Sequence, residues 1–279
     1  MQRRIRIAVL FLIVGLVMLL AAWMLNQLLA WLESVPEPAE SAQPLTPEPV
    51  ESAQKPLTRS FYADGNGWLR CENVKVVCGV DISEHQTKVD WNALYDAGAR
   101  FVMLRVGYRG STEGGLFEDA FFRSHVEAAQ DAGLALGVYF FSQAVTAEEA
   151  EAEAEFVLEH IRGLNITWPV AFDWENTGAG TRTNGLSGRD MTSCALAFCR
   201  KIQDAGYRAA VYTNRNQWML YEGYAGAQLE EYVIWMADYG TTLSEDDSFQ
   251  LWQYTDAGML PGVASTVDLN LSFTDYGAG

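Results

Sequence analysis

The stretch PVAFDWENT, residues 169–177, joins a run of apolar residues to two carboxylates, Asp173 and Glu175. Side chains alternate between the faces of a strand, so both acids point to one side, roughly 7 Å apart. Two acids on one face repel each other, which raises at least one pKa and lets one group stay protonated while the other is ionised. Such a pair suits acid catalysis. A strand that simply ends in a solvated polar loop would give the same letters, and the rest of the chain distinguishes the two interpretations.

Short apolar runs alternate with helical segments along the chain before and after this pair, a pattern typical of β/α units around a parallel sheet. Three of the helical segments end in Asp-Ala-Gly, where glycine supplies the left-handed residue that closes a helix. The predicted strands are 76–83, 101–107, 135–143, 169–175 and 209–214, and the predicted helices are 90–99, 117–133, 146–163 and 191–205.

Three more apolar runs, 232–239, 249–255 and 267–273, follow with little helix between them. Five β/α units followed by three strands make eight strands in all. The sequence therefore predicts an α/β fold, a modified TIM-like barrel whose last three strands carry little helix. In barrels of this kind the functional groups lie at the carboxyl ends of the strands.

Polar and aromatic residues do collect at the ends of the predicted strands. Four of them are acids, the catalytic candidates Glu175, Asp173, Asp81 and Asp268. Clustered carboxylates with aromatic residues favour a carbohydrate ligand, because aromatic faces pack against sugar rings and paired carboxyls cleave glycosidic bonds. The predicted substrate-binding residues are Gln86, Arg105, Tyr139, Phe141, Tyr212, Trp235, Asp238, Gln253 and Asn270.

The first 60 residues have a different character. Residues 7–25 form an uncharged apolar run, long enough to cross a bilayer, that follows three arginines. Residues 1–32 are therefore predicted to be a transmembrane signal-anchor with the rest of the chain outside the cytoplasm; a cleaved secretory signal is the alternative. Residues 33–60 contain a near duplication, PEPAESAQPLT then PEPVESAQKPLT, and read as a semi-stiff linker. Residues 61–279 remain for one catalytic barrel.

Charge and cysteine content narrow the partners and cofactors. The part after residue 32 carries 36 acids against 16 bases, a formal charge of −20, which disfavours nucleic acid as a partner. Four cysteines are few for an extracellular chain, although Cys71 and Cys78 flank a predicted hairpin and could pair. Three histidines without i, i+4 spacing argue against zinc, so no cofactor is expected.

Eight stretches in order, from residue 61 to residue 273, resemble the glycoside hydrolase family 25 lysozymes. The resemblance implies a modified β/α barrel with five helices and eight strands. It also implies N-acetylmuramidase activity on peptidoglycan glycan strands, at the β-1,4 bond after N-acetylmuramic acid. The stretches are GVDISEHQ, DWNALYDAGARFVMLRVGYRG, AGLALGVYFFS, PVAFDWE, AGYRAAVYTN, YVIWMADY, LWQYT and VDLNLSF.

The same resemblance assigns roles to the acids. Glu175 is implied as the general acid, and Asp173 as the group that orients the substrate's own acetamido group when it attacks the anomeric carbon. A direct route, with Asp81 or Asp173 as base or nucleophile, stays open. The sequence departs from the family after Gln86, where the family often has glycine and this chain has Thr87, which changes the shape of the first loop.

Two other classes of function fit the same residues. One is a non-catalytic module that binds cell-wall sugars from a membrane stalk. The other is a metal-dependent carbohydrate hydrolase or deacetylase with Asp173, Glu175 and Asp268 as ligands, because hard cations accept all-oxygen sites.

Overall fold

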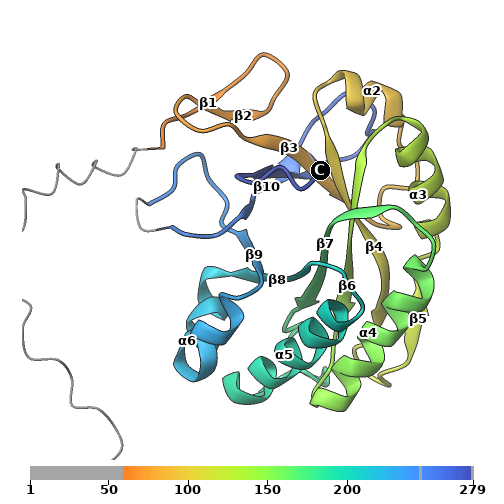
Figure 1. Cartoon of the computed structure of the whole chain (residues 1–279), viewed down its shortest axis with the longest axis vertical. Helices are drawn as coiled ribbons and strands as arrows, with labels where there is room; N and C mark the ends of the chain where they lie inside the picture. Colours follow the sequence, from red (N-terminus) through yellow and green to blue (C-terminus); the bar gives the residue numbers. More distant parts are fainter. Residues whose placement is uncertain (1–58, 245–246, 278–279) are drawn as a thin grey trace, which may run out of the picture. The chain divides into compact units, whose positions relative to one another are not determined.

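The computed structural model describes residues 59–244 and 247–277. Eight strands form a closed barrel (Figure 1), in the order β3, β11, β10, β9, β8, β7, β6 and β4, and the pairing of β4 with β3 closes the ring. The predicted fold class is confirmed. The barrel strands are β3 (Val77–Ile82), β4 (Phe101–Arg109), β6 (Ala135–Ser142), β7 (Ile166–Trp174), β8 (Ala209–Asn214), β9 (Val233–Ala237), β10 (Leu251–Gly258) and β11 (Val267–Ser272).

Five helices follow the first five barrel strands: α2 (Trp91–Asp96), α3 (Phe122–Asp131), α4 (Ala147–Ile161), α5 (Gly188–Asp204) and α6 (Arg215–Leu229). The sequence assigned no range to the helix of the fifth unit. Two glycines and an irregular apolar pattern hide α6, which starts directly after β8 because Asn214 caps it, accepting a hydrogen bond from the Gln217 N–H at 3.0 Å. Helix α3 begins at Phe122, five residues later than predicted, because β5 (Leu116–Glu118) pairs with β4 first.

The last strand, β11, runs antiparallel to both of its neighbours, β10 and β3. The expectation that all eight strands present their carboxyl ends to the site is therefore wrong for this strand. Asp268 reaches the same end of the barrel from the amino end of β11, where it lies opposite Asp81 of β3.

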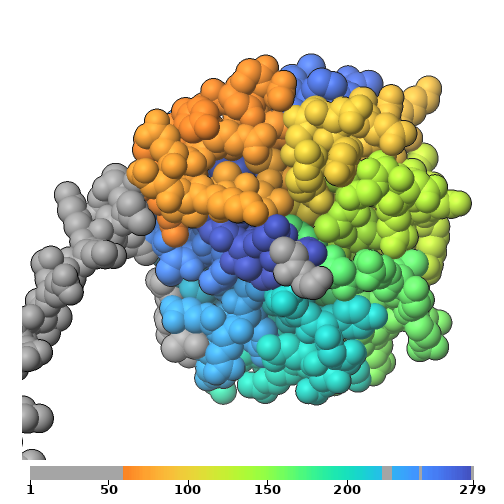
Figure 2. Space-filling model, turned by 45° about the horizontal axis from the view of Figure 1, so that its top comes forward, coloured from red at the N-terminus to blue at the C-terminus, as the bar shows by residue number. Residues whose placement is uncertain are grey.

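A hairpin precedes the barrel, made of β1 (Phe61–Ala63) and β2 (Leu69–Cys71). The hairpin predicted between Cys71 and Cys78 is thus displaced toward the amino terminus, and both cysteines are free. The ring of Phe61 lies 5.1 Å from Trp252 and 6.3 Å from Phe273. Figure 2 accordingly shows the early residues (orange) and the late residues (dark blue) side by side on one face.

The interior of the barrel contains its own apolar cluster, separate from the core between strands and helices. Phe101 stacks on Trp168 with ring centroids 3.8 Å apart. A side chain on Gly79 would lie 2.4 Å from the ring of Phe101, so glycine is needed there. On β7 the buried Val170 and Phe172 belong to the outer core and Ala171 to the inner cluster, which directs Asp173 inward.

Across residues 59–244 and 247–277, every helix is too short or too polar to span a bilayer. The predicted anchor and the duplicated linker fall outside the part of the chain that the structure describes.

Candidate active site

The four predicted catalytic acids line one cleft of about 320 Å³ at the end of the barrel where β3, β4, β6 and β7 finish. Seven of the nine predicted binding residues line the same cleft. Its complete lining is Asp81, Ser83, His85, Gln86, Arg105, Tyr139, Phe141, Asp173, Glu175, Tyr212, Trp235, Gln253 and Asp268. The hypothesis that the acids converge at a barrel mouth agrees with this geometry.

Asp173 is the most deeply enclosed acid of the D-x-E pair. It is 6 % exposed, and its Oδ1 atom has no hydrogen-bond partner within the described residues. Burial raises its pKa well above the usual value, and the nearby charges of Glu175 and Asp81 raise it further. Because its Oδ1 is unpaired, Asp173 is able to accept an N–H from a ligand.

Glu175 follows β7 and is half-buried in the cleft. Burial and then the charge of Asp81 raise its pKa, so the protonated form needed by a general acid is favoured. The backbone around it is tied down. Gln143 donates from Nε2 to the Glu175 carbonyl at 2.7 Å, and Gln217 donates to the Trp174 carbonyl.

Asp81 and Asp268 face each other across the β3–β11 ladder. Asn270 Nδ2 donates to Asp81 Oδ2 at 2.8 Å, and Gln253 Nε2 donates to Asp81 at 3.0 Å and to Asp268 at 3.1 Å. Burial and the neighbouring Asp81 raise the pKa of Asp268 to about 9, whereas hydrogen bonds from Asn270, Gln253 and Asp268 oppose the effect of burial on Asp81. The pair therefore holds a proton on Asp268 and negative charge on Asp81.

The orientation of the Gln253 amide is set by two tyrosines. Tyr212 and Tyr239 donate to its Oε1 at 2.8 and 3.2 Å, so its Nε2 must face the acids. Asn270 is held in the same way, because Trp235 Nε1 donates to its Oδ1 at 2.8 Å. Asn270 is fully buried and does not line the cleft, so its predicted role in binding substrate is replaced by the positioning of Asp81.

Asp238 is also placed differently from its prediction. Arg215 neutralises it at 2.7 Å, and it lines an adjoining hollow of about 630 Å³ instead of the acid cleft. This hollow shares Glu175 and Tyr212 with the cleft, so the two are continuous. Tyr239, 55 % exposed, belongs to the hollow and was missed by the sequence reasoning, although it directly follows a predicted strand residue.

Arg105 is the cation of the cleft. Its Nε donates to Asp119 at 2.8 Å, its Nη2 lies 2.9 Å from Glu84, and its charge lowers the pKa of Asp173. Asp119 also accepts the Glu84 N–H at 2.9 Å, which ties the loop after β3 to β4. Asp119 escaped the sequence reasoning because it fell within a predicted helix.

Ser83 and His85 also line the cleft without having been predicted, and their position in the GVDISEHQ stretch was the available signal. Among the residues that the structure describes, no group of three His, Cys, Asp or Glu side chains is arranged to hold a metal ion.

Residues 80–263 match the family described as Glycosyl hydrolases family 25. The autolytic lysozyme of Clostridium acetobutylicum is 28 % identical over 193 residues, which cover 69 % of this chain and 54 % of that protein. A family 25 glycosyl hydrolase from Bacillus anthracis superposes with a TM-score of 0.60 at 21 % identity, over 77 % of this chain and 96 % of the other.

The modular autolysin LytC from Streptococcus pneumoniae, whose structure is in complex with a synthetic peptidoglycan ligand, superposes with a TM-score of 0.61 at 24 % identity. The match covers 70 % of this chain and 46 % of LytC. This chain thus spans about half the length of the clostridial lysozyme and of LytC.

Proposed function

This chain belongs to family 25 of the glycosyl hydrolases, and from that membership we propose that it hydrolyses peptidoglycan. The bond cut is the β-1,4 linkage between N-acetylmuramic acid and N-acetylglucosamine. The observation that carries the proposal is the cleft in which Asp81, Asp173, Glu175 and Asp268 meet. Lysozymes among the relatives support the choice of polymer.

Glu175 acts as the general acid in this proposal. It protonates the glycosidic oxygen as the bond to the anomeric carbon breaks. Its raised pKa keeps the proton available, and the hydrogen bond from Gln143 to its carbonyl holds the backbone in place. Protonation of the leaving group avoids expulsion of an alkoxide, which is the costly step in water.

Asp173 assists the substrate's acetamido group. The carbonyl oxygen of that group attacks the anomeric carbon, and its N–H develops positive charge that a carboxylate stabilises. The unpaired Oδ1 of Asp173 supports this role, because a buried oxygen without a partner is costly unless a ligand supplies the donor. Water then opens the cyclic intermediate, with Glu175 taking back the proton.

The polymer would lie across the cleft and the adjoining hollow, which share Glu175 and Tyr212. The exposed ring of Tyr239 offers a stacking surface beside the acids. Two connected hollows suit a chain of sugars better than a single monosaccharide.

The test is mass spectrometry of the fragments released from purified peptidoglycan. Fragments with N-acetylmuramic acid at the reducing end support the proposal, and N-acetylglucosamine there would contradict it. Binding to the polymer without new reducing ends would indicate a non-catalytic sugar-binding module. Loss of activity after exhaustive chelation would favour the metal-dependent alternative.

We also propose that residues 1–32 anchor the enzyme in the cell membrane with the barrel outside, on the basis of the apolar run and its three arginines. The full-length protein should then fractionate with membranes, and protease added to intact cells should cut within residues 33–60. A soluble mature form that starts near residue 30 would show a cleaved signal instead.

A further inference from the structure

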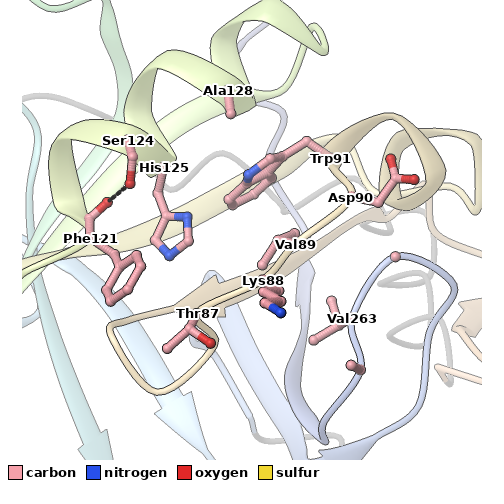
Figure 3. A pocket seen from close by; sticks show the side chains of 12 residues that line it. Thr87, Lys88, Val89, Asp90, Trp91, Phe121, Ser124, His125, Ala128 and Val263 are labelled. Atoms are coloured by element: carbon pink, nitrogen blue, oxygen red, sulfur yellow. Dashed lines mark hydrogen bonds between the residues drawn. The ribbon is translucent and has the colours of Figure 1, made fainter.

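A second cavity, of about 720 Å³, opens beside the acid cleft (Figure 3). Its walls are residues 87–91, the start of α3, and residues 262–264 of the connection between β10 and β11. The two hollows share one loop, in which His85 and Gln86 line the cleft and Thr87 and Lys88 line the cavity. A ligand in the cleft therefore needs to extend by only a few atoms to reach the cavity.

His125 gives this cavity a buried polar atom without a partner. The residue is 5 % exposed, and its ring hydrogen-bonds to the backbone of Ser83 and Gln86, two residues of the cleft. Its other nitrogen, Nε2, has no partner among the described residues. Burial lowers the pKa of His125, so the ring is neutral and Nε2 offers a lone pair to an N–H or O–H donor.

Lys88 gives the cavity a positive charge. Its side chain is exposed and forms no ion pair in the described part of the chain, and in Figure 3 it lies below Val89 toward the centre of the cavity. The one acid in the lining, Asp90, already accepts the Ala93 N–H at 3.0 Å as the cap of α2. On a barrel with a large excess of acids, a free lysine favours an anionic ligand.

The remaining wall is apolar and aromatic. Trp91 and Phe121 lie on two sides of His125, with ring centroids 5.4 and 5.7 Å from the imidazole. Val89 and Val263 pair across a β-bridge at the edge. Methyl-sized side chains fit such a wall, whereas a ligand made only of hydroxyls would leave it wet.

We propose that this cavity binds the short acidic peptide branch that peptidoglycan carries on its glycan strand. A peptide carboxylate pairs with Lys88, a backbone N–H donates to His125 Nε2, and an alanine-type methyl packs on Trp91. A neutral sugar would satisfy His125 but would leave the lysine without a role. This inference rests on the proposed function, because it takes the glycan of the same polymer to occupy the cleft.

The test compares two forms of one polymer, intact peptidoglycan and glycan strands from which an amidase has removed the peptides. Affinity is measured in the Glu175→Gln background, so that the polymer is not consumed. Lys88→Glu should weaken binding of the intact polymer by roughly threefold to tenfold, the range for an exposed ion pair and its reversal, and leave the stripped strands unaffected. The matched control is Lys75→Glu, which makes the same charge change at an exposed residue near the start of β3, away from the cavity.

Equal weakening on both polymers, or no change on either, would overturn the inference. Equal weakening by Lys75→Glu and Lys88→Glu would do so too, because it would report net charge alone. The proposed function fails on a different observation, namely that the unmodified enzyme releases no reducing ends from either polymer.

Discussion

Two carboxylates, Asp173 and Glu153, are almost equally buried in this domain, yet their surroundings are opposite. Glu153 of α4 is fully buried outside the barrel, where Arg109 Nε donates to one oxygen at 2.6 Å and Ser142 Oγ to the other at 2.6 Å. Asp173 inside the barrel mouth has an oxygen without a partner and acids as its neighbours. A carboxylate buried for the fold is paired on both oxygens. A carboxylate kept for chemistry is left incomplete, at a cost in stability.

The largest effect should come from Glu175→Gln, which tests the reactive side of this comparison. The amide keeps the shape but removes the proton, so kcat should fall about 10²–10⁴-fold while the melting temperature stays the same or rises. Turnover is measured as reducing ends released from peptidoglycan. The control is Glu153→Gln, which should keep its turnover per folded molecule, and near-normal turnover of Glu175→Gln would refute the assignment of the acid.

The second largest effect should be Glu153→Ala on the structural side. It leaves the Arg109 charge buried without its carboxylate, which costs about 3–5 kcal/mol of the free energy of unfolding. Urea denaturation gives this value. Asp173→Asn is the contrasting change, since it relieves repulsion among acids and should leave the unfolding free energy unchanged or higher while hydrolysis is severely impaired. A destabilised Asp173→Asn protein would mean that the two carboxylates are not opposites.

The pH dependence of stability should separate the two regions. The folded pKa values are about 7 for Glu153 and about 9 for Asp268, both above their ordinary values, so the folded protein keeps protons that the unfolded chain has released. The free energy of unfolding should therefore fall as pH rises from about 4, and the fall between pH 7 and 9 should come from the cleft. Asp268→Asn should flatten the thermal-melting profile in that upper window alone. An unchanged slope there would show that Asp268 holds no proton.

The smallest effect expected is a displacement of the activity profile. The charge of Asp81 is the second cause, after burial, that raises the pKa of Glu175. Asp81→Asn should therefore move the alkaline limb of kcat/KM to lower pH, in addition to lowering the rate. Residual activity of this variant with an alkaline limb at the same or higher pH would contradict the coupling between the two acids.

The strand order and the convergence of the acids could be read from the sequence because both depend on local pattern. Apolar runs of strand length end in Asp81 and Asp173, and alternation alone predicts which side chains face inward. The antiparallel course of β11 could not be read in this way. Its direction depends on pairing with β3, a contact between the two ends of the domain that leaves no periodic signal.

The departures at Asn270 and Asp238 have a related origin. Both sit where a strand meets the site, but Asn270 is held beneath Asp81 by Trp235, and Asp238 is neutralised by Arg215 from α6. Residue type and spacing predict which groups are present. Which of them touch a ligand is decided by partners that are distant in the sequence.

Closure of the barrel by its final strand has a consequence for when the enzyme becomes active. The hydrogen bond from Asn270 to Asp81 spans 189 positions of the chain, so the acid cluster joins the first barrel strand to the last. A nascent polypeptide that still lacks β11 has no Asp268, no support for Asp81 and an open ring of strands. Hydrolysis is therefore coupled to completion of synthesis, and fragments released early by the ribosome or trimmed at the C-terminus are inert toward the polymer that surrounds the cell.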